Sequence, residues 1–149
     1  MSGEYNSEID SNDIGQIILI NDNDEVLLLL RSPNMQWAGN RWALPGGHIH
    51  FGENKKVGAA RETFEETNLT AYNLELFAKQ HINDGEEKVL FFYYTRDYSG
   101  TIQLNFEHTD YKWIYIKDLE SIDVVENVKS KLLDLFTILR FNKHESNFG

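Results

Sequence analysis

The chain has 149 residues, a length typical of a single domain, and we expect one domain over residues 1–149 with a core at about 12–141 and loose termini. Its 14 Lys and Arg against 24 Asp and Glu give a formal net charge of −10, which disfavours nucleic acid and anionic membranes as partners, and the absence of cysteine excludes disulfides, thiolate catalysis and Cys-ligated zinc. Because no apolar run approaches the ~20 residues of a membrane-spanning helix and the acidic N-terminus does not resemble a signal peptide, we expect a cytoplasmic protein without a membrane partner.

The first half of the chain reads as strands and loops. Two β-rich runs, Ile14–Ile20 and Val26–Arg31, are separated by the turn-like Asn21–Asp24, which predicts a hairpin. The acidic turn lacks the central glycine and terminal glutamate of a calcium loop, so we do not expect calcium there. A loop follows at Ser32–Asn40 and a short strand at Trp42–Leu44.

The second half alternates strands with a closing helix. Leu74–Ile82 and Lys88–Asp97 are predicted strands joined by a turn at Asn83–Gly85, and the second is apolar enough to be central and buried on both faces. Tyr111–Ile116 is a further strand, and apolar residues recur at helical spacing through Val124–Phe141. Strands interleaved with helices predict a layered α/β domain.

A helix predicted at Asn54–Asn68 carries the most informative charge pattern of the chain. Since successive helical residues turn by ~100°, three carboxylates share one side of this helix: Glu62, Glu65 and Glu66. The opposite side is apolar: Val57, Ala60 and Phe64. We therefore predict that the apolar side packs on the core and that the acidic side is left free for a ligand.

The clustered acids allow two interpretations. On many surface helices such a face is merely solvated, and within the helix only Arg61 is placed to compensate Glu65. The segment Pro45-Gly46-Gly47 just before the helix favours the alternative, because glycines let a ligand approach the backbone closely. Carboxylate and carbonyl oxygens are the ligands of magnesium or manganese, which would bind a phosphate-bearing substrate.

The order of residues from Gly47 onward resembles the Nudix box. Gly47 is followed after five residues by Glu53 and after seven more by Arg61–Leu69, which reads Arg-Glu-Thr-Phe-Glu-Glu-Thr-Asn-Leu. The pattern departs from the family twice: Thr63 stands at an aliphatic position, and Asn68 stands where glycine is expected. Asn tolerates the left-handed backbone of a helix end, so we expect the geometry to be kept.

The resemblance implies a fold and an activity. The fold would be a mixed β-sheet sandwiched between helices (α/β/α). The activity would be hydrolysis of a pyrophosphate bond in a nucleoside diphosphate linked to another group, with Mg²⁺ or Mn²⁺ as cofactor. Small nucleotides are the implied substrates: ADP-ribose, dinucleoside polyphosphates, FAD or nucleoside triphosphates. The alternative is a non-catalytic nucleotide-binding regulatory module with the same fold. mRNA decapping is disfavoured by the net charge, and a homodimer stays open.

The resemblance also assigns roles by position. The metal ligands would be the Gly46 carbonyl, Glu62, Glu65 and Glu66. Arg61 would orient a glutamate, while Gly47 and Glu53 would support the loop around the metal. The general base would lie either in the box, as Glu65, or outside it, as Glu107, which precedes Trp113 by six residues; the alternative for Glu107 is an ordinary exposed loop acid.

Residues that would contact the substrate are less well defined by the sequence. Arg31 closes a strand and could reach a phosphate, and three aromatic residues could stack on a base or simply pack: Trp37, Phe106 and Tyr111. His48 and His50 alternate like a metal pair, but zinc usually needs three or four protein ligands. The segment after the box lacks the tyrosine typical of dinucleoside polyphosphate hydrolases and the proline typical of ADP-ribose enzymes, so the sequence leaves the substrate open.

Overall fold

The computed structural model describes residues 5–83 and 85–146, and for 141–146 it describes the backbone alone. The described residues form nine strands: β1 (Asp10–Leu19), β2 (Val26–Arg31), β3 (Trp42–Ala43), β4 (Gly46–His50), β5 (Thr70–Tyr72), β6 (Glu75–Asn83), β7 (Glu87–Thr95), β8 (Asp97–Ser99) and β9 (His108–Ile114). They also form two α-helices and a 3₁₀ helix: α1 (Lys55–Thr67), α2 (Val128–Ser146) and η1 (Ile116–Ser121). Asp84, in the turn predicted between the two long strands, lies outside the described residues.

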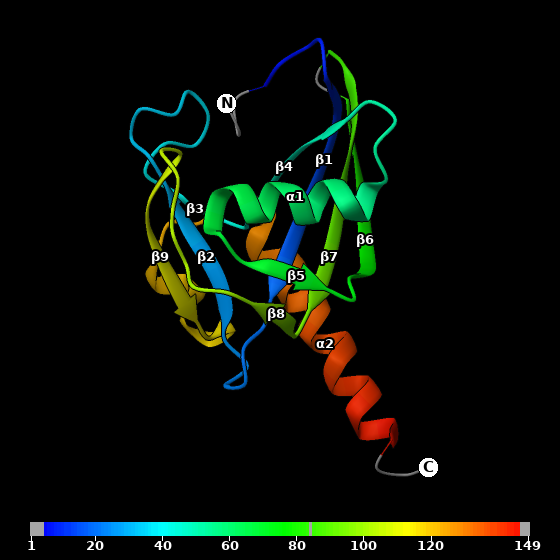
Figure 1. Cartoon of the computed structure of the whole chain (residues 1–149). Coiled ribbons are helices and arrows are strands. Elements are labelled where there is room, and N and C mark those ends of the chain that lie inside the picture. Colours follow the sequence, from blue (N-terminus) through cyan, green and yellow to red (C-terminus); the bar gives the residue numbers. More distant parts are fainter. Residues whose placement is uncertain (1–4, 84, 147–149) are drawn as a thin grey trace.

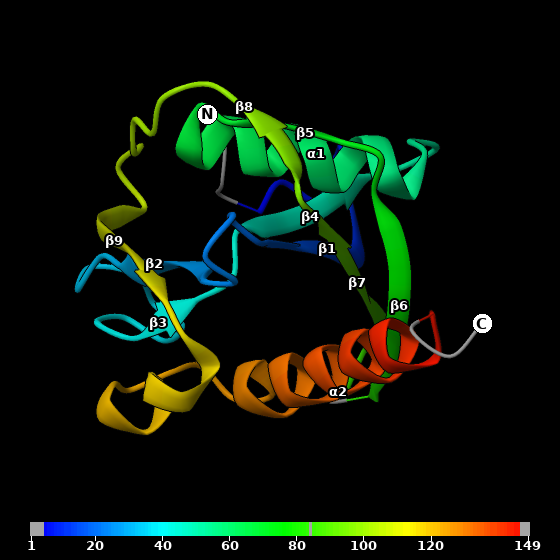
Figure 2. The same ribbon diagram turned by 90° about the horizontal axis from the view of Figure 1, so that it is seen from below.

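Two sheets form the middle of a layered molecule. The larger has the strand order β4-β1-β7-β6 and is mixed, because β1 pairs antiparallel with β4 and parallel with β7. The second has the order β3-β2-β9, and β5 pairs with β8 in a small ribbon. Helix α1 lies on one side of the larger sheet and α2 on the other (Figures 1 and 2). This is the α/β/α arrangement that the sequence predicted.

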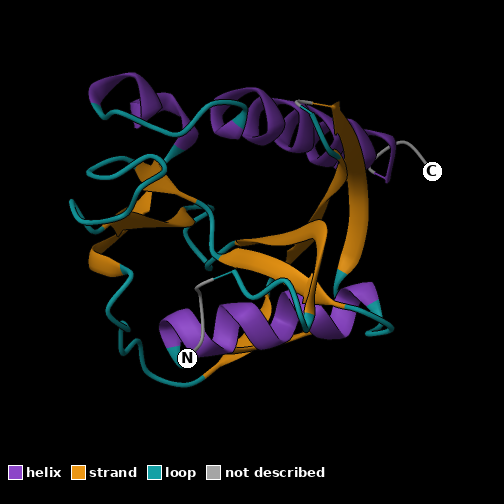
Figure 3. Ribbon diagram, turned by 90° about the horizontal axis from the view of Figure 1, so that it is seen from above, coloured by secondary structure: helices purple, strands orange, loops and turns teal. Residues whose placement is uncertain are grey.

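Strand β1 is buried on both faces, which explains its continuous apolar run. Ile17 and Leu19 pack into a cluster that includes Ala59 of α1, whereas Ile18 packs into a second cluster that includes Leu132 of α2. Each of these three β1 side chains is fully buried. Figure 3 shows the strands between the two helices that close these clusters. The core therefore has two halves, one on each side of the central strands.

The predicted hairpin between the first two strands is wrong. Strand β1 already pairs with β4 on one edge and β7 on the other, and β2 belongs to the second sheet. A single bridge between Ile20 and Val26 joins them at the turn. The turn itself forms as expected, with the Asn21 side chain accepting hydrogen bonds from the backbone of Asn23 and Glu25. Backbone pairing with distant strands, which local patterns do not encode, decides this topology.

The two glycines just before the acidic helix begin a strand. Gly46 and Gly47 open β4 and pair with Gln16 and Gly15 of β1. Gly46 has φ +143°, a conformation that favours glycine, and a Cβ there would collide with the backbone oxygen of Gly15. The glycines therefore let two backbones approach beside the acidic helix.

Helix α1 forms where the sequence predicts it, between two asparagine caps. The Asn54 side chain accepts hydrogen bonds from the N–H groups of Lys56 and Val57, at 2.9 and 3.2 Å. Asn68 ends the helix in the left-handed conformation with φ 65°, as expected for the position where the Nudix box has glycine. The substitution at this position is therefore compatible with the family's helix end.

The predicted orientation of α1 is wrong, because the helix packs on the core with its acidic side. Its buried residues are Gly58, Ala59, Glu62, Thr63, Glu66 and Thr67. Val57 and Phe64, on the apolar side, are 58% and 48% exposed. Small residues explain this choice: a Cβ on Gly15 would lie 2.8 Å from the Ala59 side chain, so β1 and α1 are in close contact there.

Within residues 5–83 and 85–146, no helix is both long enough and apolar enough to cross a membrane.

Candidate active site

Two carboxylates of α1 are buried against the glycines of β4. Glu62 and Glu66 are 4% and 3% exposed. Glu66 Oε1 accepts a hydrogen bond of 2.7 Å from the backbone N–H of Gly46. Gly47 makes room for Glu62, since a Cβ at that position would lie 2.5 Å from Glu62 Oε2. That oxygen is buried and has no hydrogen-bond partner among the described residues, so it is available to a ligand.

Arg61 gathers the other acids of the box. Its guanidinium donates to both oxygens of Glu53, at 2.9 and 3.1 Å, and to Glu62 Oε1 at 3.0 Å. It also lies 3.3 Å from both oxygens of Glu65 and 3.2 Å from the carbonyl oxygen of His48. The sequence assigned Arg61 to one glutamate, whereas it contacts three. It therefore fixes β4, the loop before α1 and the helix in one geometry.

Burial makes the two inner acids difficult to ionise in the absence of a cation. It raises the pKa of Glu62 to about 7, against the opposing effect of the hydrogen bond from Arg61 and with added repulsion from Glu65 and Glu107. Burial likewise raises the pKa of Glu66 well above its usual value, with repulsion from Glu107 as the next cause. A bound cation would reverse both effects.

Glu107 belongs to this acidic group and is not the exposed loop acid that the sequence left as an alternative. It is 3% exposed, and its carboxylate accepts a hydrogen bond of 3.1 Å from the Asn105 side chain. The pairing of β2 with β9 shifts at this point, with Arg31 opposite His108, and the Glu107 carbonyl accepts a hydrogen bond from the Ser32 N–H at 2.7 Å. The irregularity directs the start of β9 toward the acids of α1.

Arg31 and Trp37, two predicted substrate contacts, lie together at the end of β2. Arg31 Nε donates to the Trp37 carbonyl at 2.9 Å, and the guanidinium carbon lies 5.0 Å from the centre of the indole ring. Burial lowers the pKa of Arg31, and the negative charges of Glu66 and Glu107 act against this change. Arg31 therefore connects the acidic group with an exposed aromatic side chain.

The remaining aromatic candidates lie on or near β9. Tyr111 is 44% exposed and pairs opposite Leu29 of β2, and Phe106 is 50% exposed just before Glu107. Phe106 precedes the buried Glu107, and Tyr111 lies three residues after His108 on the same strand. The exposure of both rings leaves them accessible to a ligand.

The two histidines of β4 have partners within the protein. His48 Nδ1 donates to the Ser11 carbonyl at 3.1 Å, and His50 Nε2 lies 3.4 Å from the carboxylate of Asp10. These contacts, with partners on β1, support the expectation that the pair is structural.

One titratable residue of the site was missed in the sequence. His108 is 4% exposed, and its buried Nδ1 has no hydrogen-bond partner in the part of the chain that the structure describes. Burial, with a contribution from the charge of Arg31, lowers its pKa to about 4. His108 is therefore neutral at neutral pH. In the sequence, only its position next to Glu107 could have pointed to His108 as a residue of the site. A single histidine forms no motif that distinguishes a site residue from an ordinary buried or surface residue.

The donor set fits a hard divalent cation. Among the described residues, no three His, Asp or Glu side chains are grouped closely enough to hold a metal ion by themselves. The unpaired Glu62 Oε2 and the raised pKa values of Glu62 and Glu66 nevertheless indicate a site whose negative charge is only partly compensated by the protein. Oxygen donors of this kind suit Mg²⁺ or Mn²⁺, which commonly complete their coordination with water and substrate phosphates.

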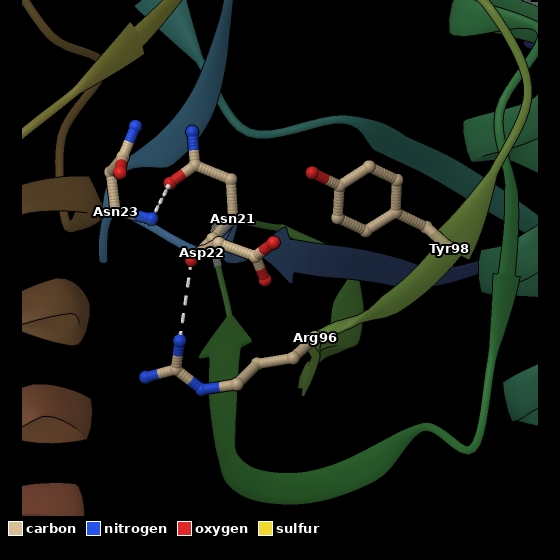
Figure 4. A pocket seen from close by; sticks show the side chains of 5 residues that line it. All are labelled: Asn21, Asp22, Asn23, Arg96 and Tyr98. Carbon is tan, nitrogen blue, oxygen red and sulfur yellow. Dashed lines mark hydrogen bonds between the residues drawn. The ribbon is translucent and has the colours of Figure 1, made fainter.

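A polar pocket lies away from the acidic group, between the turn after β1 and strand β8. Its lining residues are Asn21, Asp22, Asn23, Arg96 and Tyr98 (Figure 4). Arg96 there pairs with Asp24 at 2.7 Å. The pocket contains no residue of the acidic group, so we place the candidate active site at α1 and β4.

The NUDIX domain family model matches residues 13–136. Among curated proteins, the chain is 29% identical to the asymmetrical bis(5'-nucleosyl)-tetraphosphatase of Mus musculus over 75% of this chain and 78% of the relative. It is 30% identical to the Rattus norvegicus enzyme of that name over 72% and 76%.

Solved structures show the same fold. The MutT protein from Methanosarcina mazei Go1 superposes with a TM-score of 0.71 and 25% identity, covering 88% of this chain and 94% of that one. The NUDIX domain of Shewanella oneidensis NrtR, complexed with ADP ribose, gives a TM-score of 0.74 at 19% identity, with 91% and 94% covered. Nudix hydrolases generally need divalent metal ions and act on small nucleotides. The chain therefore belongs to the Nudix family, as a hydrolase that cleaves a pyrophosphate bond of a nucleotide.

Proposed function

We propose that the substrate is a dinucleoside polyphosphate of the bis(5'-nucleosyl) tetraphosphate type. The proposal is supported by the two mammalian relatives, whose names carry this activity and which align over about three quarters of the chain. The sequence lacks the tyrosine expected after the box, but the acidic group and its cation Arg31 suit a substrate with several phosphates. We further propose that the chain works as one Nudix domain, with its core at about 12–141.

The observation that carries the chemical proposal is the pairing of buried acids with glycines. Glu66 accepts from Gly46 N–H, and Glu62 fills the space beside Gly47 with one oxygen unpaired. We assign Glu62 and Glu66 as the main ligands of Mg²⁺ or Mn²⁺, with Glu65 and the Gly46 carbonyl as further ligands. When bound, such an ion neutralises the phosphates and lowers the pKa of a coordinated water.

The other residues then have separate tasks. Glu107 accepts the proton of the attacking water. It is a buried carboxylate, and it lies close enough to Glu66 that its charge raises the pKa of Glu66. The oxygen attacks phosphorus, and the P–O bond to the leaving phosphate breaks. Glu65, which faces Arg61, is the alternative base within the box.

Arg61 and Glu53 position the acids through their paired hydrogen bonds, and Gly47 leaves the space that Glu62 needs. Arg31 binds a phosphate that lies between the acids and Trp37, and Tyr111, which is exposed on β9, offers a further contact to the substrate. These assignments separate residues that hold the metal from residues that hold the substrate.

A substrate panel tests the proposed activity. Diadenosine tetraphosphate, ADP-ribose, FAD and ATP are each incubated with the protein and Mg²⁺ in oxygen-18 water, and the products are resolved by mass. We expect diadenosine tetraphosphate to have the highest kcat/KM and to give two unequal nucleotides, one of which carries the label. Preferred cleavage of another substrate, or no cleavage of diadenosine tetraphosphate, would contradict the assignment.

A further inference from the structure

The loop between β2 and β3 presents a tryptophan to solvent. Trp37 is 61% exposed, although a large aromatic side chain gains most from burial. The loop lies on the same side of the molecule as the C-terminal end of α1, where Glu62 and Glu66 are located (Figures 1 and 2). The loop is therefore on the side of the molecule that carries the acidic group.

The loop is tightly built, so the exposure of Trp37 is a defined feature of the fold. Asn40 N–H donates to the Arg31 carbonyl at 2.9 Å, and Met35 N–H donates to the Ser32 carbonyl at 3.1 Å. A Cβ on Gly39 would lie 3.0 Å from two backbone oxygens, which shows how closely the loop folds on itself.

Backbone strain lies next to the tryptophan. Ala38 has φ 54°, a left-handed conformation that is unfavourable for alanine. Strain of this kind persists where the surrounding structure requires a particular direction of the chain. Here it occurs directly after the residue whose side chain is turned outward.

Arg31 holds Trp37 from one side. It donates to the Trp37 carbonyl at 2.9 Å, and its guanidinium lies over the indole at 5.0 Å. The same guanidinium is influenced by the charges of Glu66 and Glu107. One cation thus stands between the acids that would bind metal and phosphate and an aromatic ring with an accessible surface.

We propose that Trp37 is a stacking platform for a nucleobase of the substrate, positioned by Arg31 beside the phosphate site. This inference rests on the proposed function and deepens it, because it selects a substrate whose phosphates carry an aromatic group within reach of Arg31. A base stacked on the indole would leave its phosphates beside the guanidinium. Base–aromatic stacking contributes affinity with little dependence on base identity, so the platform recognises nucleotides as a class.

Trp37→Ala tests the platform by comparing a ligand that has bases with one that has none. For diadenosine tetraphosphate we expect KM to rise about tenfold, the typical loss for one stacked base, with kcat little changed. The inhibition constant of inorganic tetraphosphate should stay the same, because this probe contacts Arg31 and the metal alone. Trp37→Phe should restore most of the affinity.

Tyr115→Ala is the matched control. Tyr115 is also an exposed aromatic residue under a cation, with Lys117 Nζ 5.4 Å from its ring centre, but it lies at the far end of β9. We expect this variant to behave as wild type. An unchanged KM in Trp37→Ala would overturn the platform. Equal weakening of both probes would also overturn it, since Trp37 would then only shape the loop.

A fluorescence titration separates the platform from the choice of substrate. The chain has three tryptophans, and diadenosine tetraphosphate added without metal should quench the emission of wild type but not of Trp37→Phe. Quenching without hydrolysis would overturn the proposed substrate and support the platform. Hydrolysis with the same quenching in wild type and Trp37→Phe would overturn the platform and leave the substrate assignment intact.

Discussion

The backbone N–H of Gly46 and the carboxylate of Glu66 are joined by a hydrogen bond of 2.7 Å across twenty residues of sequence. This contact fixes the start of β4 against the C-terminal end of α1 with the carboxylate inside the protein. Gly47 and Glu62 form the neighbouring contact, where the missing Cβ makes room for the second carboxylate. The fold therefore buries two acids whose charge a metal ion can compensate. Without the ion, ionisation of these buried acids lowers the stability of the folded protein.

The free energy of unfolding of the metal-free protein should therefore depend on pH. Burial raises the pKa of Glu62 from 4.5 to about 7. A group with a raised pKa in the fold stabilises it fully below about pH 4.5 and loses this contribution as the pH rises through 7. The side chain of the Glu62→Gln variant cannot ionise, so the variant should not lose this stability. Between pH 4.5 and pH 8, the difference in free energy of unfolding between the variant and wild type should change by roughly 2–3 kcal/mol in favour of the variant.

Denaturant unfolding of both proteins in EDTA measures this difference. His108, whose pKa of about 4 gives an opposite dependence in acid, is present in both and cancels in the comparison. Mg²⁺ should restore the stability of wild type at about pH 8 and have a smaller effect on Glu62→Gln. Parallel pH curves for the two proteins in EDTA would show that Glu62 ionises as freely in the fold as in the unfolded chain.

Gly47→Ala should damage the site through Glu62. The added Cβ would lie 2.5 Å from Glu62 Oε2 and 2.8 Å from its Cδ, so the carboxylate must move. Displacing Glu62, the proposed metal ligand, should lower kcat roughly tenfold to hundredfold. Steady-state kinetics with saturating Mg²⁺ measure the loss.

Gly52→Ala is the control for the backbone effect. Gly52 has φ +75°, and a Cβ there meets no atom within 4 Å. This variant should lose about 1 kcal/mol of stability through strain and keep its kcat. Equal kcat values for Gly47→Ala and wild type would remove the proposed link between this glycine and Glu62.

Thr63→Val should stabilise the protein. Thr63 is fully buried, and within residues 5–83 and 85–146 its hydroxyl has no hydrogen-bond partner. Replacing an unpaired hydroxyl with a methyl group of similar size should raise the free energy of unfolding by about 1 kcal/mol. The melting temperature, with kcat as a check on the site, measures this change.

Thr67→Val is the matched comparison one helical turn later. The Thr67 hydroxyl donates to the Thr63 carbonyl at 2.6 Å and accepts from the Leu69 N–H at 3.1 Å, so its removal should destabilise by about 1 kcal/mol. A lower melting temperature for Thr63→Val than for wild type would mean that its hydroxyl has a partner in solution.

The sequence predicted the helix of the box well because its signals are local. Asn54 and Asn68 cap the helix within one or two residues of its ends, and the spacing of the acids reflects the helical repeat. The packing direction of the helix could not be read in this way. Val57 and Phe64 look like a core face by hydrophobicity, yet contact with β1 and β4 requires the small Ala59 and the space beside Gly47.

The parts of the site outside the box depend on contacts between distant segments. Glu107 is buried because β9 shifts its pairing with β2 at Arg31, and the sequence contains no sign of this shift. The contact of Arg31 with Trp37 depends on the folded shape of the connecting loop. The residue types alone were enough to suggest these candidates. Their arrangement around the acids is visible only in the tertiary structure.

The most direct test of the central claim is the Mg²⁺-dependent hydrolysis of diadenosine tetraphosphate by Glu66→Gln, measured together with its melting temperature in EDTA. The amide oxygen can still accept from Gly46 N–H, so the fold should be retained, and Glu126→Gln at an exposed position is the control. The account predicts that kcat/KM falls by at least about a hundredfold with no loss of melting temperature. Wild-type activity in the folded Glu66→Gln protein would contradict the assignment of the buried acids as the metal site.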